Sequence, residues 1–369
     1  MKKIILIGLA VLLLCGTVNA TSWRVCSKPE AGANFLSVAE AIASNNVFTG
    51  DTLYVEPGHV ELNTITVNKK LYIFGPGYDF VGNNINVMNT DQAVFRGSIT
   101  LDQGSMLYGT THVGEIIVAS DNAVVSNCDI RNSIRTRCVS APKIQNCIIF
   151  GDIFFQQDFC SQGTSYITIQ NNIIYGQIRG PYHYATIRNN TIITSENVSD
   201  YQSLNISQYQ EYTSLRRIEN SQIYNNIIMN VSSGYSAVTN ENQTTDTLFW
   251  SELIIESLNE GNSFHNNVVS CKQRPDFLNC IFNATVENVL VWNDANTLEE
   301  KYKHKANGPA VGAGVNGTTC GAYGAVNGSR AYQPAGIPQY RPYIYDANID
   351  ETPSSNNTIN ASFKIKVQQ

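Results

Sequence analysis

Apolar and polar positions alternate in one short pattern that recurs along most of the chain. The pattern is clearest in "IQNNIIYG" (169–176), where two asparagines separate isoleucines. Its copies are "IQNCIIFG" (144–151), "IRNNTIIT" (187–194), "IYNNIIMN" (223–230), "FHNNVVSC" (264–271), "VSNCDI" (125–130) and "LNCIF" (278–282). The first asparagines of the first six copies in chain order are 19, 25, 18, 36 and 41 residues apart. Such a repeat predicts a solenoid, in which each unit buries its apolar side by stacking on its neighbours.

The units are predicted to consist of strands. Stretches such as "TITV" (64–67), "LYIF" (71–74) and "YITI" (166–169) alternate or are β-branched, and Gly, Asn and Asp separate them. The recurrent residues are Ile, Val and Asn, which excludes leucine-rich repeats. The sequence therefore predicts an all-β, single-domain parallel β-helix of roughly ten to thirteen coils.

In a β-helix the asparagine pair is explained as a corner between two strands. Ile169 is expected to point into the core before the corner, and Ile173 or Ile174 after it. A tight corner needs a left-handed residue, which Asn tolerates well. Equivalent corners stack about 4.8 Å apart, so their amides can form a hydrogen-bonded ladder. The predicted ladder consists of the first asparagines, Asn127, Asn146, Asn171, Asn189, Asn225, Asn266 and Asn279, whereas the second place varies between Asn and Cys.

The two ends and two internal segments depart from the repeat. Near the start, Ser37 and Glu40 form a capping-box pattern, which predicts a short helix that covers the first coil. Segments 195–220 and 231–262 are polar and predict lengthened loops, which in solenoids often belong to the binding face. The repeat fades after Tyr323, and the final "ASFKIKVQQ" alternates like a strand.

The first twenty residues have the basic start, apolar run and small-residue end of a secretory signal peptide. We expect cleavage after Ala20, a β-helix over 21–325 and a Pro-rich tail over 326–369. The mature chain is then secreted, periplasmic or on the cell surface, and no transmembrane segment is expected after the signal. The full chain carries a net charge of −6, and losing the two signal lysines makes it −8. Nucleic acid is therefore not an expected partner.

Eight cysteines remain after the signal peptide. Cys128, Cys147 and Cys280 occupy the second place of the repeated pair, which predicts a packing role. We expect few disulfides, and pairing between the other cysteines is left open. No Cys-x-x-Cys occurs, so no zinc site of the usual spacing is predicted.

Two stretches resemble a known superfamily. "FLSVAEAIASNNVFTGDTLYVEPGHVELNTITVNKKLYIFGPG" (35–77) resembles the opening of right-handed parallel β-helix proteins of the pectin-lyase-like superfamily. "KANGPAVGAGVNGTTCGAYGA" (305–325) resembles their closing coil, and the Pro-rich tail is similar to that of exported β-helix proteins of Bacteroidetes-type bacteria. The resemblance implies the architecture. It implies little about activity, because the superfamily includes lyases, hydrolases, esterases and non-catalytic surface proteins.

Candidate site residues lie between the copies of the corner motif. The motifs of polygalacturonases are missing, and those of pectin esterases are incomplete. Glycan binding is predicted for "IRGPYHYATIRNN" (178–190), since aromatic rings can stack on sugars while Arg or His supplies hydrogen bonds. The candidates in it are Arg179, Tyr182, His183 and Tyr184. A second candidate set is a face of acids and arginines at one-coil spacing, Asp129, Arg131, Asp152 and Arg188.

Two functional hypotheses follow. The first is a non-catalytic exported protein that binds a polysaccharide or a cell-surface glycan, and it requires no cofactor. The second is a polysaccharide lyase or a related carbohydrate-active enzyme acting on acidic polysaccharide. A lyase needs a base near a substrate carboxylate whose charge is offset by basic residues or by Ca²⁺, so Ca²⁺ is expected only in this case. The sequence does not indicate an oligomeric state.

Overall fold

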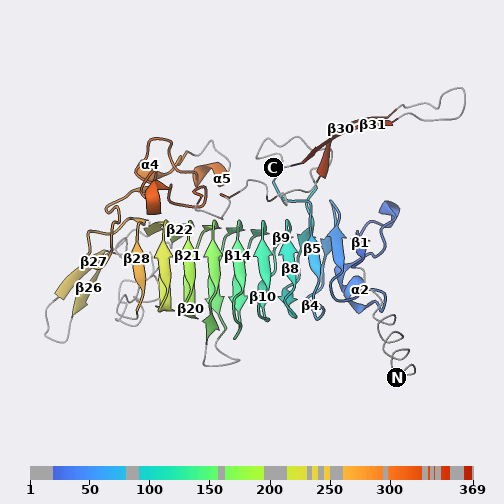
Figure 1. The fold of residues 1–369 in the computed structure, drawn as a ribbon, viewed down its shortest axis with the longest axis horizontal. Helices are drawn as coiled ribbons and strands as arrows, with labels where there is room; N and C mark the ends of the chain where they lie inside the picture. Colours follow the sequence, from blue (N-terminus) through green and yellow to red (C-terminus); the bar gives the residue numbers. More distant parts are fainter. Residues whose placement is uncertain are drawn as a thin grey trace, which may run out of the picture.

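Short strands coil into three parallel sheets that share one axis (Figure 1). Sheets A, C and B contain ten, eight and nine strands, and each strand pairs in register with its equivalent in the next coil. The fold is therefore a parallel β-helix, as predicted. The computed structural model describes residues 20–79, 91–156, 163–194, 214–230, 235–239, 245–249, 261–293, 298–325, 331–332, 336, 342–349 and 361–367.

The strands of each sheet are short. Sheet A consists of β1 (Ser22–Val25), β2 (Thr52–Val55), β5 (Tyr72–Phe74), β8 (Met106–Tyr108), β11 (Val124–Ser126), β14 (Lys143–Gln145), β18 (Thr168–Gln170), β21 (Thr186–Arg188), β24 (Gln222–Tyr224) and β28 (Ser263–His265). Sheet B consists of β3 (Val60–Glu61), β6 (Val94–Phe95), β9 (Thr111–His112), β12 (Asp129–Ile130), β15 (Ile148–Ile149), β19 (Ile173–Ile174), β22 (Thr191–Thr194), β25 (Ile227–Asn230) and β29 (Val268–Val269). Sheet C consists of β4 (Ile65–Val67), β7 (Ile99–Leu101), β10 (Ile116–Val118), β13 (Ile134–Thr136), β16 (Ile153–Phe155), β17 (Thr164–Ser165), β20 (Ile178–His183) and β23 (Leu215–Glu219).

The strands of sheets A, B and C point apolar side chains into the inside of the coil. In sheet A the middle residue points inward, as Ile144, Ile169 and Ile187 do with 0% exposure. In sheet C the middle residue points outward instead, as Arg135 does between two buried neighbours. Each fully buried isoleucine contributes about 1.5 to 3 kcal/mol. The core is thus a set of stacked apolar columns, and the middle residues of sheet C form an outward column.

The first asparagine of each motif makes the corner from sheet A to sheet B. The predicted left-handed conformation is confirmed, because φ lies between 51° and 58° at Asn127, Asn146, Asn171, Asn189, Asn225, Asn266 and Asn279. This conformation costs most other L-residues about 1 to 2 kcal/mol. Of the two isoleucines after the corner, Ile174 packs inside the coil, whereas Ile173 points outward.

A second left-handed corner, absent from the sequence-based prediction, joins sheet C to sheet A. It lies five residues before the first asparagine in each coil, at Asn122, Ala141, Tyr166, Tyr184 and Asn220, where φ is between 50° and 59°. Two tight corners therefore bracket each of these sheet A strands and limit it to three residues.

The amide ladder runs through the second place of the motif, so the predicted ladder of first asparagines needs correction. Oδ1 of Asn190 accepts hydrogen bonds from the backbone N–H and the Nδ2 of Asn172, both at 3.0 Å. The same pair of bonds joins Asn190 to Asn226 and Asn226 to Asn267. All four side chains are fully buried. The left-handed corner directs the first side chain outward, so only the second points into the coil.

Cysteines occupy both ends of this ladder. The backbone N–H of Cys147 donates to Oδ1 of Asn172 at 3.0 Å, and Sγ of Cys280 accepts the N–H of Asn267 at 3.4 Å. Cys128, Cys147 and Cys280 are free thiols, which agrees with their predicted packing role. Cys138, outside the motif, is disulfide-bonded.

Residues 305–325, here called the closing segment, lie along the outside of the coil rather than adding a coil to it (Figure 1). Nδ2 of Asn171 donates to the carbonyls of Ala322 and Gly324 at 3.0 and 2.8 Å, and Nδ2 of Asn266 donates to Ala313 at 3.1 Å. The outward first asparagines thus bind this segment. It covers an apolar column of sheet B that includes Ile148, Ile173, Ile227 and Val268.

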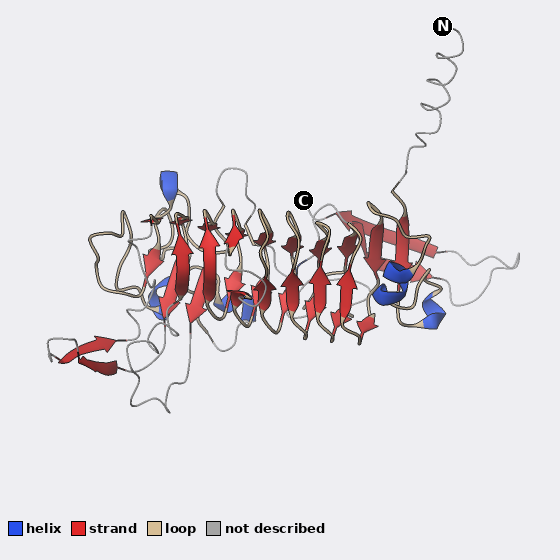
Figure 2. Ribbon diagram, turned by 90° about the horizontal axis from the view of Figure 1, so that it is seen from below, coloured by secondary structure: helices blue, strands red, loops and turns tan. Residues whose placement is uncertain are grey.

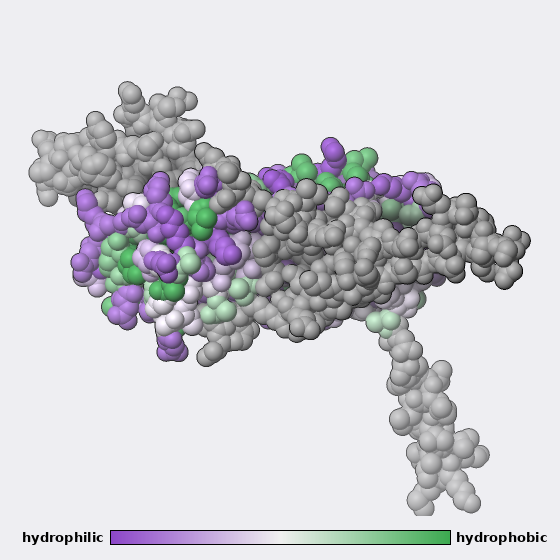
Figure 3. Space-filling view, turned by 90° about the horizontal axis from the view of Figure 1, so that it is seen from above, coloured by the Kyte–Doolittle hydropathy of each residue, from purple (hydrophilic) through white to green (hydrophobic). Residues whose placement is uncertain are grey.

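Helices α4 (Val286–Val289) and α5 (Leu298–Lys301) precede this segment, and a 3-10 turn, η5 (Val315–Gly317), lies within it. In the space-filling view of this side, polar residues predominate among the described ones and apolar residues form small groups (Figure 3). The apolar column of sheet B is therefore internal to the molecule.

The predicted N-terminal helix is α2 (Val38–Ala43), which follows the 3-10 turn η1 (Pro29–Ala31). Oγ of Ser37 caps it by accepting the N–H of Glu40 at 3.0 Å, and Val38, Ala41 and Ile42 are buried. The helix lies at the N-terminal end of the coil (Figure 2). None of the helices in the described part of the chain is long and apolar enough to cross a membrane.

The predicted loops are partly strands. Leu215–Glu219 forms β23 of sheet C, so this part of the predicted 195–220 loop is corrected, while 195–213 lies outside the described residues. In the second segment, β26 (Tyr235–Thr239) and β27 (Thr245–Phe249) form an antiparallel hairpin. Near the C-terminus, β30 (Pro342–Ile349) pairs with β31 (Ala361–Val367), which confirms the final strand.

Candidate functional site

The outward column of sheet C carries a row of cationic and aromatic side chains. Arg135, Phe154, Arg179 and Arg216 pair in register in four successive coils, and together they are called the arginine face. Each of these residues follows a buried residue of its strand. Because successive side chains of a strand point to opposite faces, each of the four points outward. One coil advances about 4.8 Å, so the three guanidinium groups repeat along the axis at multiples of that spacing.

Phe154 holds the two arginines on either side of it. The guanidinium carbons of Arg135 and Arg179 each lie 5.2 Å from the centre of the Phe154 ring. Nη2 of Arg135 donates to Glu115 at 2.6 Å, and Nη2 of Arg179 donates to Asp152 at 2.5 Å. Cation–π contact and an ion pair together limit the rotation of a long side chain. The two guanidinium groups are therefore oriented before any ligand arrives.

The described part of this face has three guanidinium groups and two carboxylates in a chain that is acidic as a whole. Nη1 of Arg135 and of Arg179 makes no hydrogen bond to any described residue, and these side chains are 25% and 37% exposed. Both oxygens of Asp152 are occupied, since Oδ1 accepts the N–H of Gln177 at 2.8 Å and Oδ2 binds Arg179. The face can therefore offer donors to an anion.

The acids and arginines that the sequence predicted to share a face, Asp129, Arg131, Asp152 and Arg188, do not form one face. Asp152 and Arg179 meet on sheet C, but Arg188 lies on sheet A, where its Nε and Nη2 both donate to Oε1 of Gln170 at 3.0 and 2.8 Å. Asp129 and Arg131 form an ion pair on sheet B at 2.7 Å. The one-coil spacing was correct, but these residues occupy different sides of the coil.

The predicted glycan-binding residues Arg179, Tyr182, His183 and Tyr184 also lie on different sides of the coil. Arg179 belongs to the arginine face, and Nδ1 of His183 lies 3.0 Å from Oε2 of Glu219 at the end of the same strands. Tyr184 is 53% exposed at the corner that follows. Tyr182 is 0% exposed and packs in the core, so it is corrected from a binding to a structural residue. The register shifts between Arg179 and Tyr182, which accounts for its inward direction.

Asp129 is the most strongly perturbed of the predicted acids. Its side chain is 1% exposed, Oδ2 binds Arg131, and Oδ1 has no partner among the described residues. Burial raises its pKa to about 6, although Arg131 opposes the shift. A carboxyl group in this environment retains its proton to a higher pH than an exposed aspartate does.

This shift predicts a pH-dependent stability. The folded chain holds the Asp129 proton more tightly than the unfolded chain, so the contribution is complete below about pH 4 and is lost as pH rises through about 6. Relative to Asp129→Asn, the native protein should lose up to about 3 kcal/mol of unfolding free energy between pH 4 and 7.5. Urea unfolding of both proteins at both pH values measures this, and an unchanged difference would contradict it.

The sequence contained a signal for part of the arginine face. Arg135, Phe154 and Arg179 each stand eight residues after the first asparagine of their coil. Aligning the coils at that offset, rather than searching for acids near the corner, would have identified them. Arg216 could not be found in this way, because the insertion over 195–213 separates it from the first asparagine of its coil.

Among the described residues, no group of three or more His, Cys, Asp or Glu side chains is arranged to hold a metal ion. Comparison of this chain with protein-family models, with curated proteins and with solved structures finds no match. Fold and side-chain geometry are therefore the basis for a functional interpretation.

Proposed function

We propose that this protein is exported and that it binds an acidic glycan, without cleaving it, through the arginine face. The observation that carries the proposal is the row of oriented guanidinium groups on one sheet, two of them held by Phe154. Guanidinium groups bind carboxylates and sulfates through paired hydrogen bonds. A polymer with an acid group on successive sugars presents anions at intervals that a row of arginines can match.

A non-catalytic role is supported by the state of the acids on this face. Elimination or hydrolysis needs a carboxylate or another base that can accept a proton from the substrate or from water. Asp152 has both oxygens in hydrogen bonds, and Glu115 is paired with Arg135. These acids orient the arginines instead.

Export is supported by the signal sequence and by the disulfide at Cys138, because disulfides persist mainly in oxidising compartments. The partner class is a polysaccharide or a cell-surface glycan rather than nucleic acid. The superfamily resemblance supports the same class of ligand.

Arg179→Ala is expected to weaken binding to an acidic polymer by about tenfold to fiftyfold, since it removes one charge-assisted pair of hydrogen bonds. Polygalacturonate, alginate and chondroitin sulfate serve as probes in affinity electrophoresis. The difference in affinity between the native protein and Arg179→Ala should decrease as salt is added, because screening weakens the contribution of the exposed charge.

Arg274→Ala is the matched control. Arg274 also contacts a phenylalanine ring, that of Phe277 at 5.0 Å, and an acid, Asp276 at 3.4 Å, but it lies outside sheet C. Equal losses in the two variants, or no binding of any of these polymers to the native protein, would reject the proposal. Release of unsaturated product from a polymer would favour a lyase instead.

A further inference from the structure

The corner from sheet C to sheet A forms a second distinctive surface. Its residues in six successive coils are Gly104, Asn122, Ala141, Tyr166, Tyr184 and Asn220, here called the corner ridge. Side chains at these positions leave the coil, because the left-handed backbone directs them outward. Nothing in the core requires large aromatic residues there.

Tyr166 and Tyr184 nevertheless form an exposed aromatic pair. Their ring centres are 5.3 Å apart with an interplanar angle of 17°, and the residues are 59% and 53% exposed. Tyr184 adjoins one face of the Tyr166 ring. On the other side the neighbouring coil presents only the methyl group of Ala141, so no side chain of the ridge covers that face. An open aromatic face of this kind stacks on the apolar face of a sugar ring.

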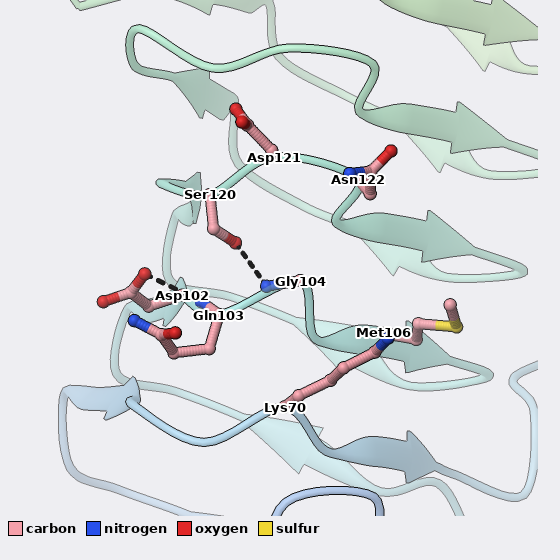
Figure 4. A pocket seen from close by; sticks show the side chains of 8 residues that line it. All are labelled: Lys70, Asp102, Gln103, Gly104, Met106, Ser120, Asp121 and Asn122. Atoms are coloured by element: carbon pink, nitrogen blue, oxygen red, sulfur yellow. Dashed lines mark hydrogen bonds between the residues drawn. The ribbon is translucent and has the colours of Figure 1, made fainter.

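A polar pocket of about 350 Å³ lies further along the same ridge (Figure 4). It forms at Gly104, which has no side chain, between Lys70 in the preceding coil and Asn122 in the following one. Asp102 and Asp121 line it. One oxygen of each accepts a backbone N–H, from Gln103 at 2.7 Å and from Ser140 at 2.6 Å. The second oxygen of each has no hydrogen-bond partner in the described part of the chain.

We propose that the corner ridge is a subsite for a neutral oligosaccharide, separate from the arginine face. Hydroxyl groups of one sugar donate to Asp102 and Asp121 in the pocket, and a later sugar of the same chain stacks on Tyr166 above Ala141. The pocket and Tyr166 are three coils apart, about 14 Å along the axis, which a short oligosaccharide spans. Two carboxylates against the one ammonium group of Lys70 leave the pocket with a net negative charge. This charge disfavours an acidic sugar, so the ligand class differs from that of sheet C.

Calorimetric titration with neutral tetrasaccharides tests the subsite, with cellotetraose, laminaritetraose and mannotetraose as probes. At least one should bind the native protein. Tyr166→Ala should weaken that binding about tenfold, and Tyr166→Phe, which keeps the ring, should retain it. Asp121→Asn keeps the acceptor for Ser140 but loses the charge, so it should weaken binding severalfold.

Phe48→Ala is the control, because Phe48 is similarly exposed at 56% but lies near the N-terminal helix. It should bind like the native protein. Failure of all three tetrasaccharides to bind, or equal affinity in Tyr166→Ala and the native protein, would overturn the subsite. The acidic polymers report on the arginine face separately, so Tyr166→Ala should leave their binding unchanged and Arg179→Ala should leave tetrasaccharide binding unchanged.

Discussion

Replacing Asn190 with alanine is expected to lower the free energy of unfolding by about 3 to 5 kcal/mol. Asn190 lies in the middle of the buried ladder, where its Oδ1 accepts two hydrogen bonds from Asn172 and its Nδ2 donates to Ile169, Arg188 and Asn226. Alanine would leave the buried N–H of Asn172 without a partner and would open a small cavity. Chemical unfolding followed by circular dichroism measures the loss.

Asn190→Cys provides the control, because the chain itself uses cysteine at this place. Sγ of Cys280 accepts the N–H of Asn267, and a cysteine sulfur at position 190 could accept that of Asn172 in the same way. We expect Asn190→Cys to lose about half as much stability as Asn190→Ala. Equal losses would show that the ladder hydrogen bonds are not what stabilises this corner.

Tyr182→Ala is expected to destabilise the fold by about 3 to 5 kcal/mol, the usual cost of removing a buried aromatic ring. Tyr182 is 0% exposed, and its hydroxyl lies 3.3 Å from that of Thr136 in the core. Tyr182→Phe keeps the ring and should lose only about 1 kcal/mol. Thermal unfolding of both variants separates packing from the hydrogen bond.

Tyr184→Ala is the matched comparison two residues away. Tyr184 is 53% exposed and contacts the ring of Tyr166, so its removal should cost less than about 1 kcal/mol. A loss of stability in Tyr184→Ala as large as that in Tyr182→Ala would contradict the assigned directions of the two side chains.

The architecture could be predicted because the corner imposes strict requirements on sequence. A left-handed residue between two core-facing residues strongly favours asparagine, and Asn171 and its equivalents recur in the coils from Asn127 onward, whereas the coil before them turns from β8 to β9 at Gly109. The partner of each strand then follows from the repeat alone.

The direction of individual side chains was harder to predict. The sequence does not distinguish Asn171 from Asn172 as the ladder residue, because that choice depends on which of them is left-handed. Ile173 looks like a core residue, yet it is buried on the outside, beneath a closing segment more than a hundred residues later. Long-range cover of this kind leaves no local sequence pattern.

The candidate site was predicted only in part, because the directions of its side chains were also hard to predict. Arg179 and Asp152 were identified and do meet, but Tyr182 was assigned to ligand binding because no residue pattern indicates the register shift beside it. Arg188 and Asp129 share the one-coil spacing of Arg179, but they lie on other sheets. Spacing along the chain determines the coil to which a residue belongs. The number of residues between it and the corner asparagine determines the face on which it lies.

Labelling of arginines with a dicarbonyl reagent, read by mass spectrometry with and without bound acidic polymer, tests whether the arginine face binds the polymer. Polygalacturonate, alginate and chondroitin sulfate are the polymers. If the arginine face binds the polymer, the bound polymer should protect Arg135, Arg179 and Arg216 together and leave Arg274 unchanged, with no unsaturated product released. Unchanged labelling of the three arginines, or protection confined to another face such as that of Arg188, would contradict it.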